Sequence, residues 1–444
     1  MRSRVVLCAV LGALTLASRA EAFCGFFVGK ADAKLFNKSS QVALVRDGDR
    51  TVLTMSNDYQ GPLSEFALVV PVPSVLTRDQ IHIGNRKLLE RLDAYSSPRL
   101  VEYTDPDPCA VRDRSSWPMA AMPMAVRRKS AAFEDHAKAM GVTIEAAYTV
   151  GEYDILLLSA TQSEGLEAWL RESGYRIPPH ASRALAPYIK QDMKFFVAKV
   201  NLKEQKAAGF QELRPLQIAY ESPRFMLPIR LGMANADGPQ DLIVYALTRN
   251  GRVESSNYQT VKIPSDAEVP EFVQKEFGEF YKAAFTHAWK QHGQRAVVTE
   301  YVWNMGWCDP CAAPPLETAE LRELGVFWLD AANAQGRMRG PVGMPIILTR
   351  LHVRYDAEHF PEDLMFQETG DQQNFQGRYV MNHPFKGEMK CEARQGYLTS
   401  VRERRRREAS TLAALTGWSE AKVRQRMGPD APIQPDPWWK TLWK

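Results

Sequence analysis

The residues best suited to chemistry are two cysteines in the segment Trp307-Cys308-Asp309-Pro310-Cys311. A Cys-x-x-Cys pair at the start of a helix can interconvert between dithiol and disulfide, because the positive helix end stabilises the thiolate of the first cysteine. A strand is predicted before the motif at 297–303 and a helical stretch after it at 317–324. Cys308 would then be the nucleophile, and Cys311 the resolving thiol, of a thiol–disulfide oxidoreductase.

The motif resembles the active site of thioredoxin, and Gly343-Met344-Pro345 resembles the proline loop that faces that site. However, only 33 residues separate Cys311 from Pro345, with one helix and one predicted strand at 326–329, and a thioredoxin-like domain needs another helix there. Two interpretations stay open: a redox pair, or a structural bridge within the motif or to Cys391. The structural bridge is favoured. A zinc site would need a second pair of ligands, which is not evident.

The N-terminus has the features of a cleavable signal peptide. Arg2 and Arg4 form a basic start, residues 5–16 are almost entirely apolar, and Ala20-Glu21-Ala22 has the small-x-small pattern of a cleavage site. The apolar run is too short to cross a bilayer as a helix and has the length of a signal-peptide core. We expect cleavage after Ala22, with residues 1–22 removed, and a periplasmic or extracellular mature protein.

The remaining chain of about 422 residues can bury a sizeable core and suggests two or three domains. The formal net charge of +4 falls to about +2 without the signal peptide, so charge gives no argument for a nucleic-acid partner. No later segment has the length and apolarity of a membrane span. The mature protein is therefore expected to be released or held non-covalently.

Export makes the cysteines disulfide candidates, because thiols usually become oxidised outside the cytoplasm. Cys8 would leave with the signal peptide, and five candidates remain: Cys24, Cys109, Cys308, Cys311 and Cys391. An odd number allows at most two bridges and leaves one thiol over, unless a partner takes it. A bridge between Cys24 and Cys109 is expected, since both flank β-elements of the first domain.

Apolar periodicity predicts an α+β, β-rich fold with antiparallel, sandwich-like sheets, helical insertions and a C-terminal helical segment. Asp47-Gly48 and Asn250-Gly251 each separate two strand patterns and predict hairpins. Helices are predicted at 84–95 and 269–291, and a capping box at 161–164.

The expected units are the signal peptide at 1–22, a β-rich domain with a long loop at 23–130, an α+β domain with a β-hairpin at 131–265, a helix with strands and the Cys-x-x-Cys motif at 266–395, and a basic helical tail at 396–444.

The C-terminal tail combines basic and aromatic residues. A helix predicted at 397–416 carries five arginines, and three tryptophans stand near the end of the sequence: Arg402, Arg404, Arg405, Arg406, Arg407, Trp438, Trp439 and Trp443. Basic and aromatic groups together are typical of an anchor on anionic lipid. The favoured alternative is a solvated helix face docked by its apolar stripe. The partners considered are therefore an envelope protein or an anionic membrane surface, with no nucleic acid, and the oligomeric state stays open.

Acidic and histidine residues gather in one short segment, at His352, Asp356, Glu358, His359 and Asp363. Such side chains could bind a metal, but a polar strand end and turn explain them more simply. The chain has no His-Glu-x-x-His, phosphate-binding glycine loop or EF-hand loop. No metal and no cofactor are therefore expected.

Several segments, taken in order, resemble the bacterial family DUF2330. They are Cys24-Gly25-Phe26-Phe27, Asp58-Tyr59-Gln60-Gly61 with Phe66, Val70-Pro71-Val72-Pro73, the segments 148–154, 194–200 and 227–232, Cys308-Asp309-Pro310-Cys311, and the segments 349–355 and 360–364. The family name says that the activity is unknown. The resemblance therefore implies exported bacterial proteins and no catalytic residues that could be carried over.

These observations favour an exported envelope protein with a non-enzymatic binding or structural role. The alternatives are a thiol–disulfide oxidoreductase using Cys308 and Cys311, and an envelope factor that associates with the membrane through its C-terminus. A hydrolase or metalloenzyme with an unrecognised site is a further option, and an enzyme is the less favoured class.

Overall fold

The computed structural model describes residues 26–29, 36–60, 66–110, 141–173, 181–201, 204, 213–233, 238–306, 313–329 and 346–428. The predicted signal peptide, Cys24, Cys308, Cys311 and the three C-terminal tryptophans lie outside these residues. Among the helices within them, none is long and apolar enough to cross a membrane.

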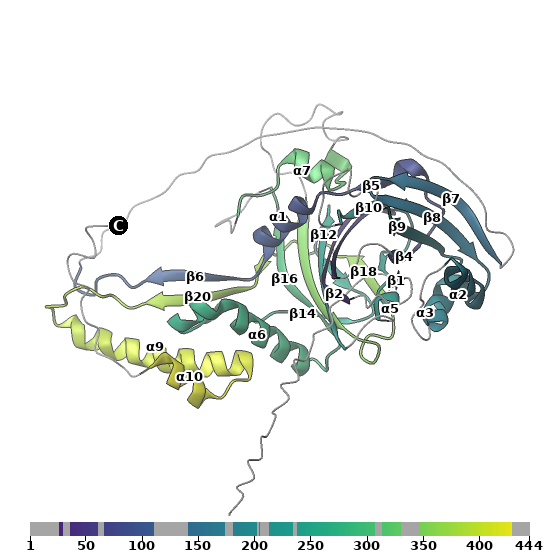
Figure 1. Ribbon diagram of the computed structural model, residues 1–444. Coiled ribbons are helices and arrows are strands. Elements are labelled where there is room, and N and C mark those ends of the chain that lie inside the picture. Colours follow the sequence, from purple (N-terminus) through teal and green to yellow (C-terminus); the bar gives the residue numbers. More distant parts are fainter. Residues whose placement is uncertain are drawn as a thin grey trace, which may run out of the picture.

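Two sheets packed face to face form the body of the molecule (Figure 1). The large sheet has the strand order β14–β16–β17–β12–β2–β3–β10–β5, with β19 beside β16. Its strands are β2 (Phe36–Asp47), β3 (Arg50–Gln60), β5 (Ile81–Ile83), β10 (Leu216–Glu221), β12 (Gln240–Thr248), β14 (Gln259–Lys262), β16 (Ala296–Asn304), β17 (Ile347–Tyr355) and β19 (Phe375–Gln376). The predicted hairpin at Asp47-Gly48 is confirmed, because β2 and β3 pair with Asp47 opposite Arg50.

The small sheet is antiparallel throughout, in the order β1–β4–β9–β8–β7. Its strands are β1 (Phe26–Gly29), β4 (Phe66–Val72), β7 (Val142–Val150), β8 (Tyr153–Ala160) and β9 (Lys194–Val200). Side chains alternate between the two faces of each strand, and the inward-facing ones form the core between the sheets. Val42 and Leu44 of β2 face Leu68 and Val70 of β4, whereas Ala43 points to the outer face.

The α+β class is confirmed, although the large sheet is mixed rather than antiparallel. The β12–β2 and β14–β16 pairs are parallel, and the other pairs of this sheet are antiparallel. Strands from three of the units expected from sequence share this one sheet.

The predicted hairpin at Asn250-Gly251 is wrong. Strand β12 pairs with β2 and β17, and β13 (Val253–Ser255) instead pairs with β18 (Leu364–Glu368), which also pairs with β11 (Met226–Leu227). The backbone N–H groups of Arg249 and Asn250 donate to the Glu368 carboxylate at 3.0 and 2.6 Å. Contacts with β18, distant in sequence, therefore override the local turn preference.

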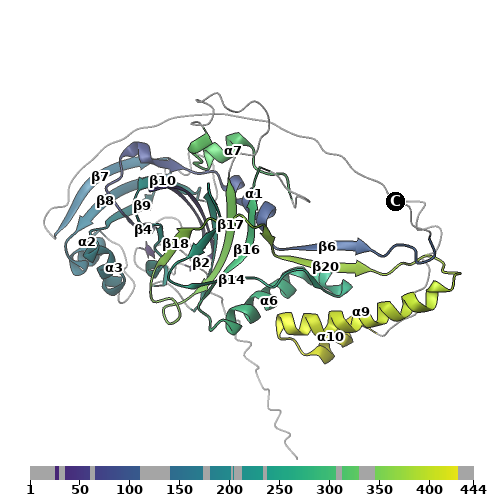
Figure 2. The ribbon, with the colours of Figure 1, turned by 180° about the vertical axis from the view of Figure 1, so that it is seen from behind.

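Helices cover the outer faces of both sheets (Figures 1 and 2). Helix α1 (Arg86–Ser96), which confirms a prediction, and α7 (Thr318–Glu323) lie on the large sheet. Helices α2 (Ser163–Glu172) and α3 (Ala181–Lys190) cover the small sheet, and α5 (Arg230–Met233) lies nearby. The predicted capping box is wrong, because α2 has Gln162 at its N-cap and no side chain caps it.

A long arm projects from the body (Figures 1 and 2). Its parallel three-stranded sheet contains β15 (Ala267–Glu268), β20 (Arg378–His383) and β6 (Arg99–Thr104). The helical layer contains the 3-10 helix η4 (Glu271–Glu276), α6 (Phe277–Gln291), α9 (Ala393–Thr416) and α10 (Glu420–Met427). Buried residues from all of these helices form one apolar cluster with Tyr379 of β20, so the helices are docked on the arm sheet.

Candidate functional site

Charged side chains gather where α1 and α6 cover the outer face of the large sheet. Arg350, His352 and Arg354 alternate along β17 and therefore project from one face, whereas Leu351 and Val353 enter the core between the sheets. The set, which we call the buried charge network, consists of Asp93, Asp241, Tyr245, Tyr281, Glu300, Arg350, His352 and Arg354.

Glu300 of β16 is the centre of this network and is 0% exposed. One carboxylate oxygen accepts a hydrogen bond from Arg350 Nε at 2.5 Å. The other lies 2.7 Å from His352 Nδ1 and also accepts from the Tyr281 hydroxyl. Burial would raise the pKa of Glu300, but the charges of His352 and Arg350 outweigh it and lower the pKa to about 2. Glu300 is therefore an ionised carboxylate inside the protein.

The histidine of the network is held on both ring nitrogens. His352 Nε2 lies 3.2 Å from Asp241, which also binds Arg354 through two contacts of 2.8 Å. Phe285 of α6 stacks on the imidazole with the ring centroids 3.6 Å apart. Burial would lower the pKa of His352, but the carboxylates of Glu300 and Asp241 raise it. A protonated imidazole between two carboxylates follows from this geometry.

The network joins helices to the sheet. Arg350 Nη1 donates to Asp93 of α1 at 2.6 Å, and the Tyr245 hydroxyl donates to the same oxygen at 2.9 Å. Every charged member has a partner of opposite charge, and Glu300 and Arg350 are buried. Buried charges paired in this way fix the relative positions of α1, α6 and the sheet.

The acidic and histidine residues that gather near 352–363 are not brought together by the fold. His352 belongs to the buried charge network, His359 pairs with Asp356 at 2.8 Å, and Asp363 accepts from Tyr188 at 2.6 Å. Within the described ranges, no group of three His, Cys, Asp or Glu residues could hold a metal ion.

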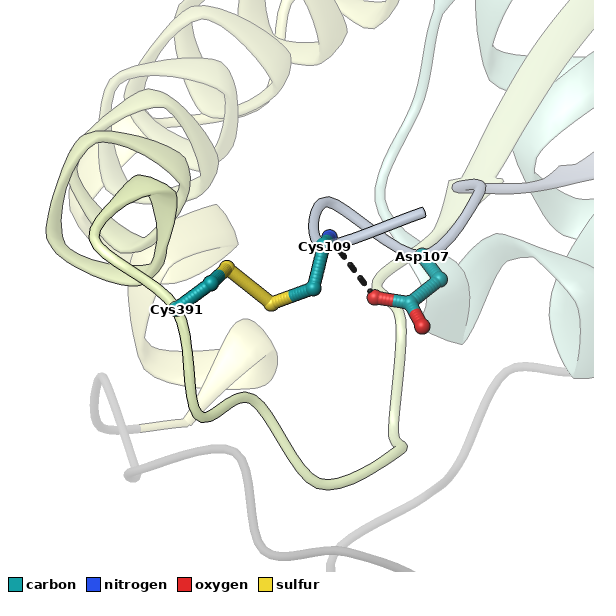
Figure 3. Close-up of a disulfide and its surroundings, with 3 residues drawn as sticks. All are labelled: Asp107, Cys109 and Cys391. Carbon is teal, nitrogen blue, oxygen red and sulfur yellow. Dashed lines mark hydrogen bonds between the residues drawn. A yellow bond between two sulfur atoms is a disulfide. The ribbon is translucent and has the colours of Figure 1, made fainter. Parts of the chain in front are cut away.

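A disulfide joins Cys109, just after β6, to Cys391, just before α9 (Figure 3). The sulfurs are 2.06 Å apart, and the Cys109 N–H donates to Asp107 at 2.8 Å. The expected bridge between Cys24 and Cys109 is therefore wrong, as is a bridge from the Cys-x-x-Cys motif to Cys391. Both cysteines lie at the tip of the arm, where the ends of β6 and β20 meet α9.

The redox interpretation of Cys308 and Cys311 stays a prediction, because both residues lie outside the described part. Nearby, the predicted helix is confirmed as α7, whereas segment 326–329, predicted as a strand, forms none. Cys24 lies outside the described part as well.

Asp105 joins the three elements of the arm tip. Its carboxylate accepts from Arg404 Nη1 and Nη2 at 2.9 and 2.8 Å and from the Tyr397 hydroxyl at 2.6 Å. Its backbone N–H donates to His383 at the end of β20. Burial would raise the pKa of Asp105, but the hydrogen bonds from Arg404 and Tyr397 lower it. The ionised carboxylate and the neighbouring disulfide thus hold the first half of α9 on the arm sheet.

The arginines of α9 do not form one face. Arg404 binds Asp105, and Arg405 donates to the carbonyl oxygens of Met427 and Gly428 at the end of α10. Arg402, Arg406 and Arg407 are exposed on the opposite side, and the described residues give none of them an ion-pair partner. Trp438, Trp439 and Trp443 lie outside the described part, so the combined basic and aromatic surface stays a prediction.

A groove of about 210 Å³ lies at one end of the space between the two sheets, lined in part by Pro71, Met193, Tyr220 and Arg224. This volume is below the range of about 300–1,000 Å³ that is usual for small-molecule sites. The groove is separate from the buried charge network.

Glu300 and Arg350, the buried ion pair of the network, were not among the residues predicted from the sequence. Glu300 stands in an apolar strand pattern at 296–303, and such an isolated acid in a buried strand is a signal that a partner must exist. The alternation of Arg350, His352 and Arg354 is a second signal. Asp105 has no comparable local signal, because its partners Tyr397 and Arg404 come from a distant segment.

These elements define an α+β protein with a two-sheet body and a disulfide-tied arm. Residues 18–367 match the family described as "Uncharacterized protein conserved in bacteria (DUF2330)". The chain belongs to this family, which confirms the resemblance seen in its sequence. No curated protein matches the chain, and no solved structure matches it. Strand β20 and helices α9 and α10 lie beyond the matched residues.

Proposed function

We propose that this chain is an exported protein of the cell envelope with a non-enzymatic role, and that its arm docks on an anionic membrane surface. Export is supported by the signal-type N-terminus and by the Cys109–Cys391 disulfide, since such bonds persist in oxidising compartments. The non-enzymatic role is supported by the buried charge network, whose charged groups bind one another where α1 and α6 cover the large sheet.

The observation that carries the docking proposal is the set of exposed arginines at Arg402, Arg406 and Arg407, which we call the basic face. Arg402 and Arg406 are four residues apart on a helix, a like-charge spacing that costs about 0.2–0.5 kcal/mol. Glu403, exposed on the same side, lies three residues before Arg406 and four before Arg407, a spacing that offsets part of this cost. The three arginines outnumber Glu403, so this side of the helix keeps a net positive charge that an anionic partner would neutralise.

A phospholipid surface is favoured over other anions by the remaining chain. Helix α10 ends at Met427 on the same arm, and the sequence then continues to Lys444 with three tryptophans and two lysines. Tryptophan and lysine are typical of residues at the boundary between lipid and water. A continuous anionic surface could contact both the basic face and this segment.

Vesicle flotation tests the proposal. The full mature chain is expected to float with vesicles that contain phosphatidylglycerol and to remain unbound with pure phosphatidylcholine. Changing Arg402, Arg406 and Arg407 to glutamine should lower binding about 100-fold, since each cationic residue near an anionic membrane contributes about 1 kcal/mol. High salt should weaken binding as well.

A matched control removes three exposed lysines from the body instead: Lys87, Lys190 and Lys199. This variant has the same net charge as the arginine variant and should float like the wild type. Equal losses in the two variants would show that net charge, not the basic face, governs binding. Failure of the wild type to float with anionic vesicles would overturn the docking proposal.

A further inference from the structure

Glu408 is an acidic residue on the buried side of α9, opposite the basic face. It is 5% exposed and lies one residue before the buried Ala409. Helix α9 packs on β15, and Leu412, one turn further on, belongs to the apolar cluster with Val269 and Val273. The carboxyl group therefore lies between the helix and the surface on which the helix docks.

The charges around Glu408 come from several elements of this contact. Glu268 of β15 and Glu271 of η4 are the acidic neighbours, and His383 of β20 lies 3.3 Å from Glu271 and 2.9 Å from Glu102 of β6. On α9 itself, Arg404 Nε approaches Glu408 at 3.6 Å, and Arg405 lies further round the helix with its guanidinium on the end of α10.

Arg404 compensates Glu408 only weakly, because both of its terminal nitrogens bind Asp105. Burial, reinforced by Glu268 and Glu271, therefore outweighs Arg404 and raises the pKa of Glu408 to about 7. The carboxyl group is neutral at mildly acidic pH and ionised at mildly alkaline pH, while it faces two other acids.

We infer that Glu408 is a proton-controlled latch that fixes the second half of α9 to the arm when it is protonated and loosens this half when it is ionised. This inference rests on the proposed membrane docking, because α9 carries the basic face. The disulfide and the Asp105–Arg404 ion pair keep the first half of the helix attached in both states. A firmly held basic face binds an anionic surface more tightly than a mobile one, since less ordering is required on binding.

The expected size of the effect follows from proton linkage. If opening returns Glu408 to its ordinary pKa of 4.5, the opening equilibrium should increase roughly tenfold between pH 6 and pH 8.

Hydrogen exchange of the α9 amides, corrected for the intrinsic pH dependence of exchange, tests the latch without any membrane. Protection in residues 408–416 should fall roughly tenfold from pH 6 to pH 8 in the wild type and stay constant in Glu408→Gln. The control Glu403→Gln removes an exposed acid of the same helix and should behave like the wild type. In Glu268→Gln, the loss of protection should occur at a lower pH than in the wild type, because the change removes a negative charge that repels ionised Glu408.

Flotation with anionic vesicles separates the two proposals. Binding should weaken from pH 6 to pH 8 in the wild type and Glu403→Gln, and stay constant in Glu408→Gln. If the wild type binds vesicles equally well at every pH, Glu408 does not control docking, but the docking proposal itself still holds. The absence of binding at every pH would overturn the proposed function, and constant protection of wild-type α9 would overturn the latch.

Discussion

Glu300 and His352 form a buried pair in which the carboxylate oxygen and Nδ1 are 2.7 Å apart, between the large sheet and α6. The pair is the centre of a larger arrangement, since Glu300 also binds Arg350 and Tyr281, and His352 also contacts Asp241. The stability of the body should therefore depend strongly on this one carboxylate.

Replacing Glu300 by glutamine should lower the free energy of unfolding by about 3–5 kcal/mol, because it leaves Arg350 and His352 buried without their shared counter-ion. Urea denaturation followed by circular dichroism measures the change. Glu358→Gln, on an exposed turn, is the control and should change stability by less than about 0.5 kcal/mol. A loss below about 1 kcal/mol in Glu300→Gln would show that the network rearranges without cost.

The same carboxylate predicts how stability depends on acid. The pKa of Glu300 is lowered in the folded state from its ordinary 4.5 to about 2, so its contribution is present above about pH 4.5 and is lost as the pH falls toward 2. The full contribution is about 3 kcal/mol. The difference in unfolding free energy between wild type and Glu300→Gln should therefore narrow from pH 6 to pH 3. A constant difference over that range would contradict an ionised Glu300.

Removing the disulfide with a Cys109→Ser/Cys391→Ser double variant should destabilise the protein by about 2–5 kcal/mol, since the bridge restricts the unfolded chain over 282 positions. Thermal unfolding with and without reductant measures this loss. Reductant should have little further effect on the double variant. Peptide mapping under non-reducing conditions should give one cross-linked species containing Cys109 and Cys391, and a Cys24–Cys109 species would contradict the structure.

Gly251 should not tolerate a side chain. A Cβ atom at this position would lie 2.2 Å from the backbone oxygen of Thr369, which cannot move without disturbing β18. Gly251→Ala should therefore cost about 1–3 kcal/mol in unfolding free energy, measured by urea denaturation. Gly370→Ala is a matched control, because a Cβ atom there meets nothing within 4 Å. Equal effects of the two changes would show that the turn at Gly251 is loosely packed.

Local patterns predicted the elements well and their partners poorly. The apolar spacing of Leu88, Leu89 and Leu92 identified α1, since one side of a helix must be buried wherever it docks. Asn250-Gly251 wrongly predicted a hairpin, because the strand that follows it, β13, pairs with β18, more than 100 residues away. Cysteine counting likewise could not show that Cys109 would bond to Cys391, since pairing depends on which strand and helix ends meet in space.

The candidate surfaces were predicted only in part. The basic helix was recognised, but its division into exposed and bound arginines depends on Asp105, nearly 300 residues earlier in the chain. The buried charge network escaped prediction for the same reason, because its members come from five separate helices and strands.

The bridge between Cys109 and Cys391 closes most of the chain into a covalent ring. A tension applied between the two ends of the molecule would pass through the sulfur–sulfur bond and bypass residues 110–390. A single proteolytic cut within the ring would likewise leave every fragment attached until the bond is reduced. The bridge at the arm tip therefore shields residues 110–390 from mechanical extension and holds the fragments of a cut chain together.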